Sequence, residues 1–406
     1  MTRRPLGRRE PPGAAPGPGR TSWAAVAALL GAGVVAAAQI GGAAAALPVL
    51  TDSFGLGPGT AAWYLSTVSA LGAAGGALLG WLGQGLGFGR QVRLGLAAIV
   101  AADLGGALVD SLAGLMVARV GEGLGLVLVI LAAPPLLAEV AAPGQRRLVA
   151  GTWGAYMPVG SGLAALLVPV AIGLVGWRGA SVADGCVAAV ALAVVARWVP
   201  SVGERRRPSS AGLLGALRSP TVVLTAAVFA LYAAQYLAVV GLFPAALVAD
   251  AGFSVADAGW VGALVFLVNA PANVLGAYLL HRGVPLRWVV AGGCAGMALA
   301  VWGVLDPGLP VGVRIAAAVA FSGVSGVVPA ALFAGLAAVS GGTRSAGAAI
   351  GLVTQGSAVG QLLGPPLVVA VGAGLGSGAP QAAVLVGVSG LVATGASLLP
   401  RGPRAT

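Results

Sequence analysis

Residues 115–125, LMVARVGEGLG, place an arginine and a glutamate inside a stretch that is otherwise apolar from residue 112 to residue 138. A charge at the centre of a bilayer costs about 2.5–3.5 kcal/mol on insertion scales. Arg119 and Glu122 are three residues apart, so in a helix they share one face and can partly neutralise each other. The stretch therefore predicts a membrane helix that carries a functional site.

The composition extends this prediction to the whole chain. Hydrophobic residues make up 58% of the 406 residues and charged residues 8%, whereas a soluble domain has about 25% charged residues. Apolar runs of about 20 residues, the length that crosses a bilayer as a helix, recur along nearly the whole chain. We therefore predict an all-α integral membrane protein that is surrounded by the lipid bilayer.

The apolar runs predict twelve transmembrane helices in two six-helix bundles. The N-terminal bundle, residues 22–199, has spans at 22–49, 60–83, 92–109, 112–138, 149–173 and 179–199. The C-terminal bundle, residues 220–399, has spans at 220–247, 257–280, 288–305, 311–338, 345–372 and 380–399. Outside the bundles we expect a disordered basic tail over 1–21, a polar linker over 200–219 and a short tail over 400–406.

The arginines predict the orientation of the chain. Every basic residue is Arg, and with twelve spans the arginines fall almost entirely in connections on one side of the membrane. Only Arg178 and Arg314 fall on the other side, and Arg119 lies within a span. By the positive-inside rule this side is the cytoplasm, so we expect both termini there, in a protein of the cytoplasmic membrane. No arginine cluster carries interleaved aromatic residues, so no nucleic-acid partner is expected despite the net charge of +11.

Two pairs of segments indicate that the halves are repeats. The sequence from Gly80 to Arg90 closes the second predicted span, and the sequence from Gly276 to Arg287 closes the eighth at the corresponding place. Residues 154–160, GAYMPVG, in the fifth span correspond to residues 360–366, GQLLGPP, in the eleventh. Two repeated six-span halves joined by a basic loop are the architecture of one class of secondary transporter.

At these residues the chain resembles the major facilitator superfamily, over all of its length except the N-terminal tail. The family's loop between spans two and three has the pattern G-x-L-A-D-R-x-G-R-[KR], which Gly80, Leu82 and Gly87 match, with Arg90 and Arg93 as nearby basic residues. Gln84 stands at the acidic position of the pattern. The resemblance implies that the charge contacts of this gating loop are weaker or differently built here.

Two further elements carry the resemblance. In the fourth span Arg119, Gly123 and Gly125 match an R-x-x-x-G-x-G element, which implies that Arg119 faces the central cavity and takes part in substrate or proton coupling. In the fifth span Pro158 and Gly160 fit the family's glycine-rich antiporter signature loosely, and a Gly-Pro pair, Gly364-Pro365, lies in the eleventh span. The resemblance to the antiporter subclass implies exchange of a substrate for protons.

Asp103 makes the charged site a candidate triad. It precedes the turn at Ser111 by eight residues, and Arg119 follows that turn by eight, so an antiparallel hairpin puts both at one depth. Either Asp103 pairs with Arg119 and leaves Glu122 free to take a proton, or Glu122 neutralises Arg119 and Asp103 lies in a small water-lined pocket. A third reading is that the ion pair only holds two helices together. Intramembrane charges usually mark pathways, so we favour a functional site.

Uncharged polar residues inside the spans are candidates for the cavity lining or for ordinary bonds between helices. These candidates are Gln39, Tyr156, Tyr232, Gln235, Tyr236, Asn269, Asn273 and Gln355. Tyr64, near a span end, is interpreted as an anchor at the membrane interface, and Trp177-Arg178 as an anchor with a snorkelling cation.

The sequence contains no catalytic constellation, no Walker loop and no metal-ligand spacing, so we expect neither an enzyme nor a cofactor or metal. We predict a monomeric secondary transporter that moves a small organic molecule by alternating access, as proton-linked efflux. An uptake permease that holds a small organic acid through Arg119 is the first alternative. A transport-inactive sensor or assembly subunit is the second. The sequence does not specify the substrate.

Overall fold

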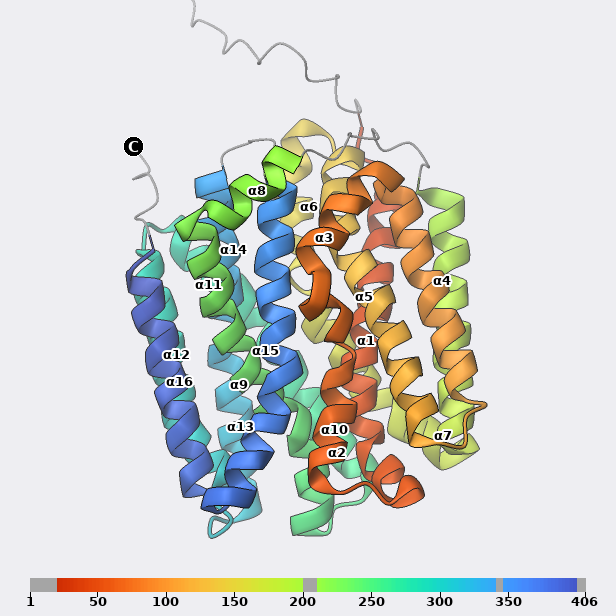
Figure 1. Ribbon diagram of the computed structural model, residues 1–406, viewed down its shortest axis with the longest axis vertical. Coiled ribbons are helices and arrows are strands. Elements are labelled where there is room, and N and C mark those ends of the chain that lie inside the picture. The colour runs from red at the N-terminus through yellow and green to blue at the C-terminus, as the bar shows by residue number, and fades with distance from the viewer. Residues whose placement is uncertain (1–19, 200–209, 341–345, 400–406) are drawn as a thin grey trace, which may run out of the picture.

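The computed structural model describes residues 20–199, 210–340 and 346–399, and all regular secondary structure in these ranges is helical (Figure 1). In the first half the helices are α1 Trp23–Phe54, α2 Pro58–Thr67, α3 Ala70–Leu86, α4 Phe88–Gly106, α5 Leu112–Val140, α6 Arg146–Trp153 and α7 Tyr156–Trp198, with a 3-10 turn at Pro143–Gln145. In the second half they are α9 Pro220–Ala251, α10 Val255–Leu267, α11 Asn269–His281, α12 Leu286–Leu305, α13 Val311–Ser325, α14 Val327–Ser340, α15 Ala346–Leu375 and α16 Ala379–Ser397.

The helices account for the twelve predicted spans. Ten helical stretches of the described chain are long and apolar enough to cross a membrane. One of them, Gly151–Trp198, is 48 residues long and turns at Gly176, whose φ of +70° separates two spans. The remaining span is α4, whose 19 residues include Arg90, Arg93 and Asp103. The all-α, twelve-span membrane architecture is therefore confirmed.

The predicted linker contains a helix of its own, α8 Ser210–Arg218, so it is not an extended connection throughout. Residues 1–19 of the predicted tail, residues 200–209 of the linker and residues 400–406 lie outside the described residues.

The same local sequence signals mark the two ends of the first span in each half. The side chain of Ser22 accepts a hydrogen bond from the third amide of α1, and Ser219 does the same for α9. Such N-caps satisfy a backbone donor that has no partner inside the helix. Gly55 and Gly252 end the two helices in the left-handed conformation, with φ of 59° and 68°, which glycine adopts without steric cost. Both helices have 32 residues, as expected for a repeated fold.

The packing repeats as well. α1 lies along the first part of α7, and α9 lies along α15. A Cβ on Gly41 would collide with the backbone of Ser161, and a Cβ on Gly360 with that of Ala230. Gly160 and Gly364, from the antiporter-like segments, approach the backbones of α1 and α9 in the same way. Small residues allow this backbone contact, which drives helix association in membranes.

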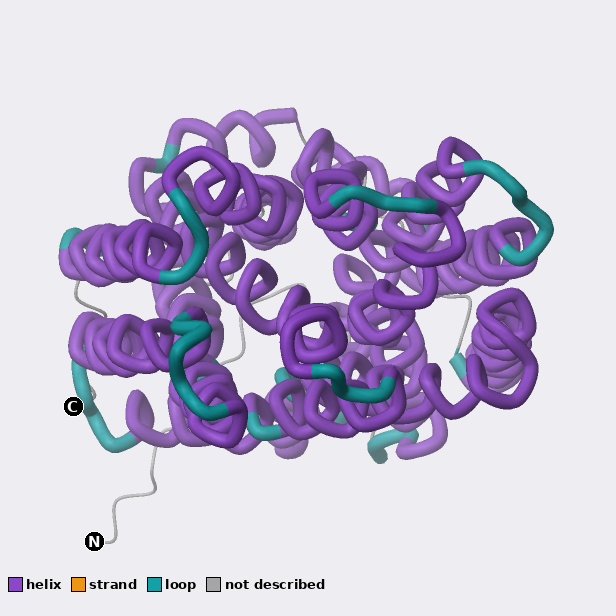
Figure 2. The backbone as a smooth tube through the Cα atoms, turned by 90° about the horizontal axis from the view of Figure 1, so that it is seen from below, coloured by secondary structure: helices purple, strands orange, loops and turns teal. Residues whose placement is uncertain are grey.

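The two halves meet where α2 and α3 pack against α15, where α7 packs against α10, and where α1 contacts α9 and α10. We call the end where α1 begins and α16 ends the terminal end, at the top of Figure 1, and the opposite end the distal end. Figure 2 views the bundle from the distal end, where the helices are seen nearly end-on. Several spans are broken into two helices, and the breaks expose backbone groups that side chains can bind.

Candidate functional site

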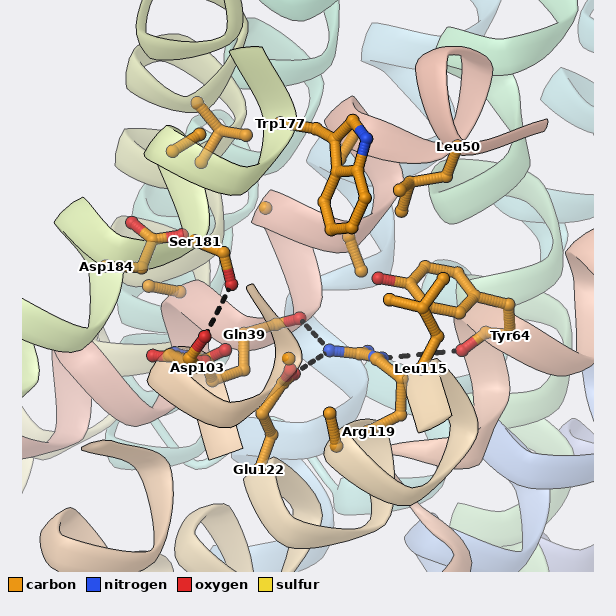
Figure 3. Close-up of a pocket in the computed structure, with 18 of the residues that line it drawn as sticks. Gln39, Leu50, Tyr64, Asp103, Leu115, Arg119, Glu122, Trp177, Ser181 and Asp184 are labelled. Atoms are coloured by element: carbon orange, nitrogen blue, oxygen red, sulfur yellow. Dashed lines mark hydrogen bonds and ion pairs between the residues drawn. The ribbon is translucent and has the colours of Figure 1, made fainter. Parts of the chain in front are cut away.

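A cavity lies inside the first half, between α1, α2, α4, α5 and both parts of α7 (Figure 3). It holds about 60 Å³ of water-accessible space, enough for a few water molecules. Its polar lining is Gln39, Tyr64, Asp103, Arg119, Glu122, Ser181 and Asp184. Trp177 and Leu50 form the side opposite Arg119 and Glu122. The segment LMVARVGEGLG thus contributes two charged groups to this cavity.

Arg119 is 2% exposed and has a full set of partners. Its guanidinium forms an ion pair with Glu122, one turn further along α5. It also donates to the backbone carbonyls of Gln39 at 3.0 Å, Tyr64 at 3.4 Å and Leu65 at 3.5 Å. The planar guanidinium presents several donors in a fixed geometry, so one buried side chain joins α5 to α1 and α2.

The end of α2 explains why these carbonyls are available. α2 ends at Thr67, so the carbonyls of Tyr64 and Leu65 are among the last four of the helix, which have no partner inside it. A cation at this end also interacts favourably with the helix dipole. Arg119 therefore caps α2 at the point where the second span is broken.

Tyr64 belongs to this site. Its ring is 7% exposed, and the Arg119 guanidinium lies 5.3 Å from the ring centroid. The interpretation of Tyr64 as an anchor at the membrane interface is wrong. Its position near the end of an apolar run suggested the lipid interface, but the break after Thr67 turns α2 inward against α5.

Asp103 lies in the cavity, where it has no basic partner within the part of the chain that the structure describes. Gln39 Nε2 donates to Asp103 Oδ2 at 3.2 Å, and Ser181 Oγ donates to the Asp103 backbone carbonyl at 2.8 Å. Of the two arrangements that the sequence left open, the structure has the second, in which Glu122 pairs with Arg119 and Asp103 lies in a small pocket. Gln39 links Asp103 to the ion pair, because its backbone carbonyl accepts from Arg119 while its side chain donates to Asp103.

Asp184 is the residue that the sequence analysis missed. It lies two turns after the bend at Gly176, lines the cavity, and has no hydrogen-bond or ion-pair partner among the described residues. Its signal was available, because Asp184 is a charge within an apolar span. The cavity therefore contains three carboxyl groups and one guanidinium.

Close packing holds the charged helix in place. A Cβ on Gly123 would collide with the Val68 carbonyl, at the break between α2 and α3, and a Cβ on Gly125 would approach the Gly95 carbonyl to 2.5 Å. The two glycines of the R-x-x-x-G-x-G element thus let the broken second span and α4 approach α5 closely.

The gating-loop residues lie at the terminal end, away from the cavity. Gly80 and Leu82 lie in α3, and Gly87 joins α3 to α4 with a φ of 83°. Arg90 is exposed in the first turn of α4, and Arg93 donates to the Val199 carbonyl at 2.9 Å. The side chain of Gln84 lies outside the described part of the structure.

The second half has a neutral polar cluster, which we define as Tyr232, Tyr236, Asn269, Asn273, Ser322 and Ser325. Asn269 Nδ2 donates to the Ser322 carbonyl at 3.0 Å and to Ser325 Oγ at 2.9 Å. Asn273 Nδ2 donates to Asn269 Oδ1 at 2.7 Å. The Tyr236 hydroxyl lies 3.5 Å from Ser322 Oγ, and its ring stacks on Tyr232 with centroids 5.9 Å apart. Four of the predicted candidates, Tyr232, Tyr236, Asn269 and Asn273, thus lie in one cluster.

The remaining candidates lie elsewhere. Gln235 accepts a hydrogen bond from Ser389 Oγ at 2.8 Å, between α9 and α16. Tyr156 stacks on Trp153 with centroids 4.3 Å apart, and Pro158 is buried two residues later in α7. Gln355 bonds to the backbone of α3 across the contact between the halves, and Pro365 lies within α15.

Two similarly packed six-helix halves with polar clusters inside their spans define a class of secondary membrane transporters. The chain belongs to the Major Facilitator Superfamily, whose family model matches residues 29–365. Members of this family are transporters rather than enzymes.

Solved structures support the fold. The xylose transporter XylE from E. coli, in a partially occluded inward-open conformation, gives a TM-score of 0.72 at 15% sequence identity, covering 95% of this chain and 99% of that one. A bacterial homologue of the human lysosomal transporter Spinster, in an inward-facing and occupied conformation, gives a TM-score of 0.72 at 18% identity, covering 94% and 98%. No curated protein matches the chain.

Proposed function

We propose that this protein exports a small organic molecule across the cytoplasmic membrane in exchange for protons, by alternating access, with both termini in the cytoplasm. The observation that carries the coupling is the excess of carboxyl groups in the first-half cavity, where Asp103, Glu122 and Asp184 face one guanidinium. Uncompensated charge is costly in such a place. A buried carboxylate without a cationic partner is most simply neutralised by a proton.

The contacts assign different parts to the three acids. Glu122 forms the ion pair with Arg119, so we propose that it stays ionised and holds that arginine. Asp103 has only the Gln39 amide as a side-chain partner, and Asp184 has none among the described residues. We therefore assign proton uptake to Asp103 and Asp184, with the cavity water as the route between them.

The neutral cluster of the second half supports a moderately apolar substrate. Its groups are tyrosine rings, hydroxyls and amides, which recognise uncharged hydrogen-bonding groups and apolar surface. Tyr236 and Asn273 are only partly buried, so they are the members that a substrate can reach. In alternating access the two halves move against each other, and this movement would couple substrate binding at the neutral cluster to proton binding in the charged cavity.

Uptake of an organic acid has less support. Arg119 is 2% exposed and already binds Glu122 and three carbonyls. A carboxylate substrate would have to displace these partners before it could use the guanidinium. A transport-inactive protein would move no protons with any compound, so a vesicle assay distinguishes it from an exporter.

The test is proton movement in sealed vesicles that contain the purified protein and a pH-sensitive dye. A panel of moderately apolar compounds is applied to each side. Movement of one of them from the cytoplasmic to the outer side should be accompanied by proton movement in the opposite direction. Asp103→Asn and Asp184→Asn should each abolish it. Asp110→Asn is the matched control, because Asp110 pairs with Arg178 outside the cavity and is exposed. Full coupling in both cavity variants would overturn the assignment, and no movement with any compound would favour the inactive alternative.

A further inference from the structure

The second span has a kink that a side chain of the other half occupies. Within α3, Gly75 departs from helical geometry, with φ of −154° and ψ of 27°. In a regular helix the amide of Ala77 would donate to the carbonyl of Ala73, four residues earlier. These two backbone groups flank the kink.

Both groups bond to one carboxamide from α15. Gln355 Oε1 accepts from the Ala77 amide at 3.1 Å, and Gln355 Nε2 donates to the Ala73 carbonyl at 2.9 Å. The side chain thus stands between the two groups that a regular helix would join to each other. Donor and acceptor are both satisfied, so the kink leaves neither group unpaired.

The backbones of α3 and α15 are close enough for this bond because of small residues. A Cβ on Gly76 would lie 2.9 Å from the Gln355 Cβ, and one on Gly72 would lie 2.9 Å from the Ala358 Cβ. Six residues after Gln355 in the same helix, Gln361 Oε1 accepts a hydrogen bond from Ser69 Oγ at 2.9 Å. The contact between the halves is therefore specific and polar along this line.

We propose that Gln355 is a positioning residue that holds α3 in its kinked form only while the two halves are docked here. When α15 moves away, the Ala73 carbonyl and the Ala77 amide lose their partner together. They are the right pair to bond to each other, so α3 can return to a regular helix without leaving a backbone group unpaired in the membrane. The docked and separated states of the halves then correspond to two forms of one helix.

This device connects the charged cavity to the contact between the halves. The second span is capped at its first break by Arg119 and filled at its kink by Gln355. In the corresponding eighth span, the side chain at the break is Asn269, whose partners Ser322 and Ser325 belong to its own half. We call the two hydrogen bonds from Gln355 to α3 the latch. It is a property of the second span and is not repeated in the eighth.

The experiment measures the separation of the halves and needs no substrate, so its outcome is independent of the proposed export function. Spin labels are placed at Leu94 on α4 and Trp288 on α12, both exposed and on different halves, in full-length protein whose Cys186 and Cys294 are replaced by serine. In Gln355→Leu the ratio of long to short label distances should rise about tenfold, as expected for losing two hydrogen bonds.

Gln381→Leu is the matched control. Gln381 also accepts from a backbone amide, of Gly378 at 3.0 Å, and donates to a backbone carbonyl, of Val368 at 2.9 Å, but both lie in the second half. Its distance distribution should match the parent's. An unchanged distribution in Gln355→Leu, or an equal shift in both variants, would overturn the proposal.

Gly75→Ala provides an independent variant. The nearest atom to an added Cβ is the Leu78 Cβ at 4.0 Å, so there is room for the methyl group. Alanine favours a regular helix over glycine, so the distances should shift in the same direction as in Gln355→Leu. Hydrogen exchange of the Ala77 amide distinguishes a change between two forms of α3 from a general loosening of the contact between α3 and α15. The amide should stay protected in Gln355→Leu if the helix bond re-forms, and its exposure would contradict the proposal.

Discussion

The two halves are packed alike but bury different chemistry. α1 against α7 and α9 against α15 use the same backbone contact at glycine. Inside its spans, however, the first half contains Arg119, Glu122, Asp103 and Asp184, whereas the cluster of the second half is uncharged. Among the described residues of the second half, the buried charged side chain is Arg314, which lies at the distal end, 3.7 Å from Asp250. A repeated scaffold can therefore hold unlike sites.

The difference shows how a buried charge becomes tolerable in a membrane. Arg119 has the carboxylate of Glu122 and the carbonyls exposed by the break after α2. In the second half the Ser322 carbonyl, near the end of α13, accepts instead from the Asn269 amide and from Ser325 Oγ. A broken span thus supplies polar partners in both halves, and the side chain that fills the break decides the charge of the site.

Removing the cation should have the largest effect. Arg119→Met leaves Glu122 buried without its partner and the Tyr64 and Leu65 carbonyls uncapped. A loss of about 3–5 kcal/mol in the free energy of unfolding is expected, as for one partner of a buried ion pair. Thermal unfolding in detergent measures it. The double variant Arg119→Met with Glu122→Met should recover much of the loss, and a double variant as unstable as the single one would show that capping dominates over charge.

Packing should respond equally in the two halves. Gly160→Ala in α7 and Gly364→Ala in α15 each place a Cβ 2.2 Å from a backbone carbonyl oxygen of the neighbouring first helix, so each should destabilise the fold by about 1–3 kcal/mol. Gly31→Ala is the control, because nothing lies within 4 Å of its Cβ position. The same unfolding measurement applies. If the free energy of unfolding falls for the variant of only one half, the repeats are not packed equivalently.

A change in the neutral cluster should lower the free energy of unfolding without changing the number of protons moved per transported molecule. Asn269→Leu removes hydrogen bonds to the Ser322 carbonyl and Ser325 Oγ, which should cost about 1–2 kcal/mol. Proton movement per transported molecule should be unchanged, although transport itself can slow. The vesicle assay with the pH-sensitive dye reads this ratio, and a changed ratio would contradict the separation of tasks between the halves.

The sequence predicted the spans well because their signal is local. The length of each apolar run was enough to predict the spans, and α4 was recognised in spite of Arg90, Arg93 and Asp103. Tyr232, Tyr236, Asn269 and Asn273 were recognised as polar residues at helical spacing, whereas Gln235, predicted on the same helix face as the two tyrosines, bonds to α16 instead.

The partners inside the site were harder to predict because they depend on breaks in the helices. Spacing alone allowed Arg119 to pair with Asp103 or Glu122, and the end of α2 at Thr67 was needed to see which carbonyls hold the guanidinium. Tyr64 was misplaced for the same reason. Gln355 was a candidate for the cavity lining or for a bond between helices. Its bonds to Ala73 and Ala77 could not be predicted, because they depend on a kink that its own segment does not encode.

The smallest effect on stability should come from Asp184→Asn. Asp184 has no partner among the described residues, so its replacement by an amide of nearly equal size breaks no described bond. The free energy of unfolding should change by less than about 0.5 kcal/mol, while proton movement is lost. Asp103→Asn is the informative companion, because its Gln39 bond makes a stability change of about 1 kcal/mol expected as well. If Asp184→Asn is clearly destabilising, this carboxyl group has a structural partner and is not a free proton acceptor.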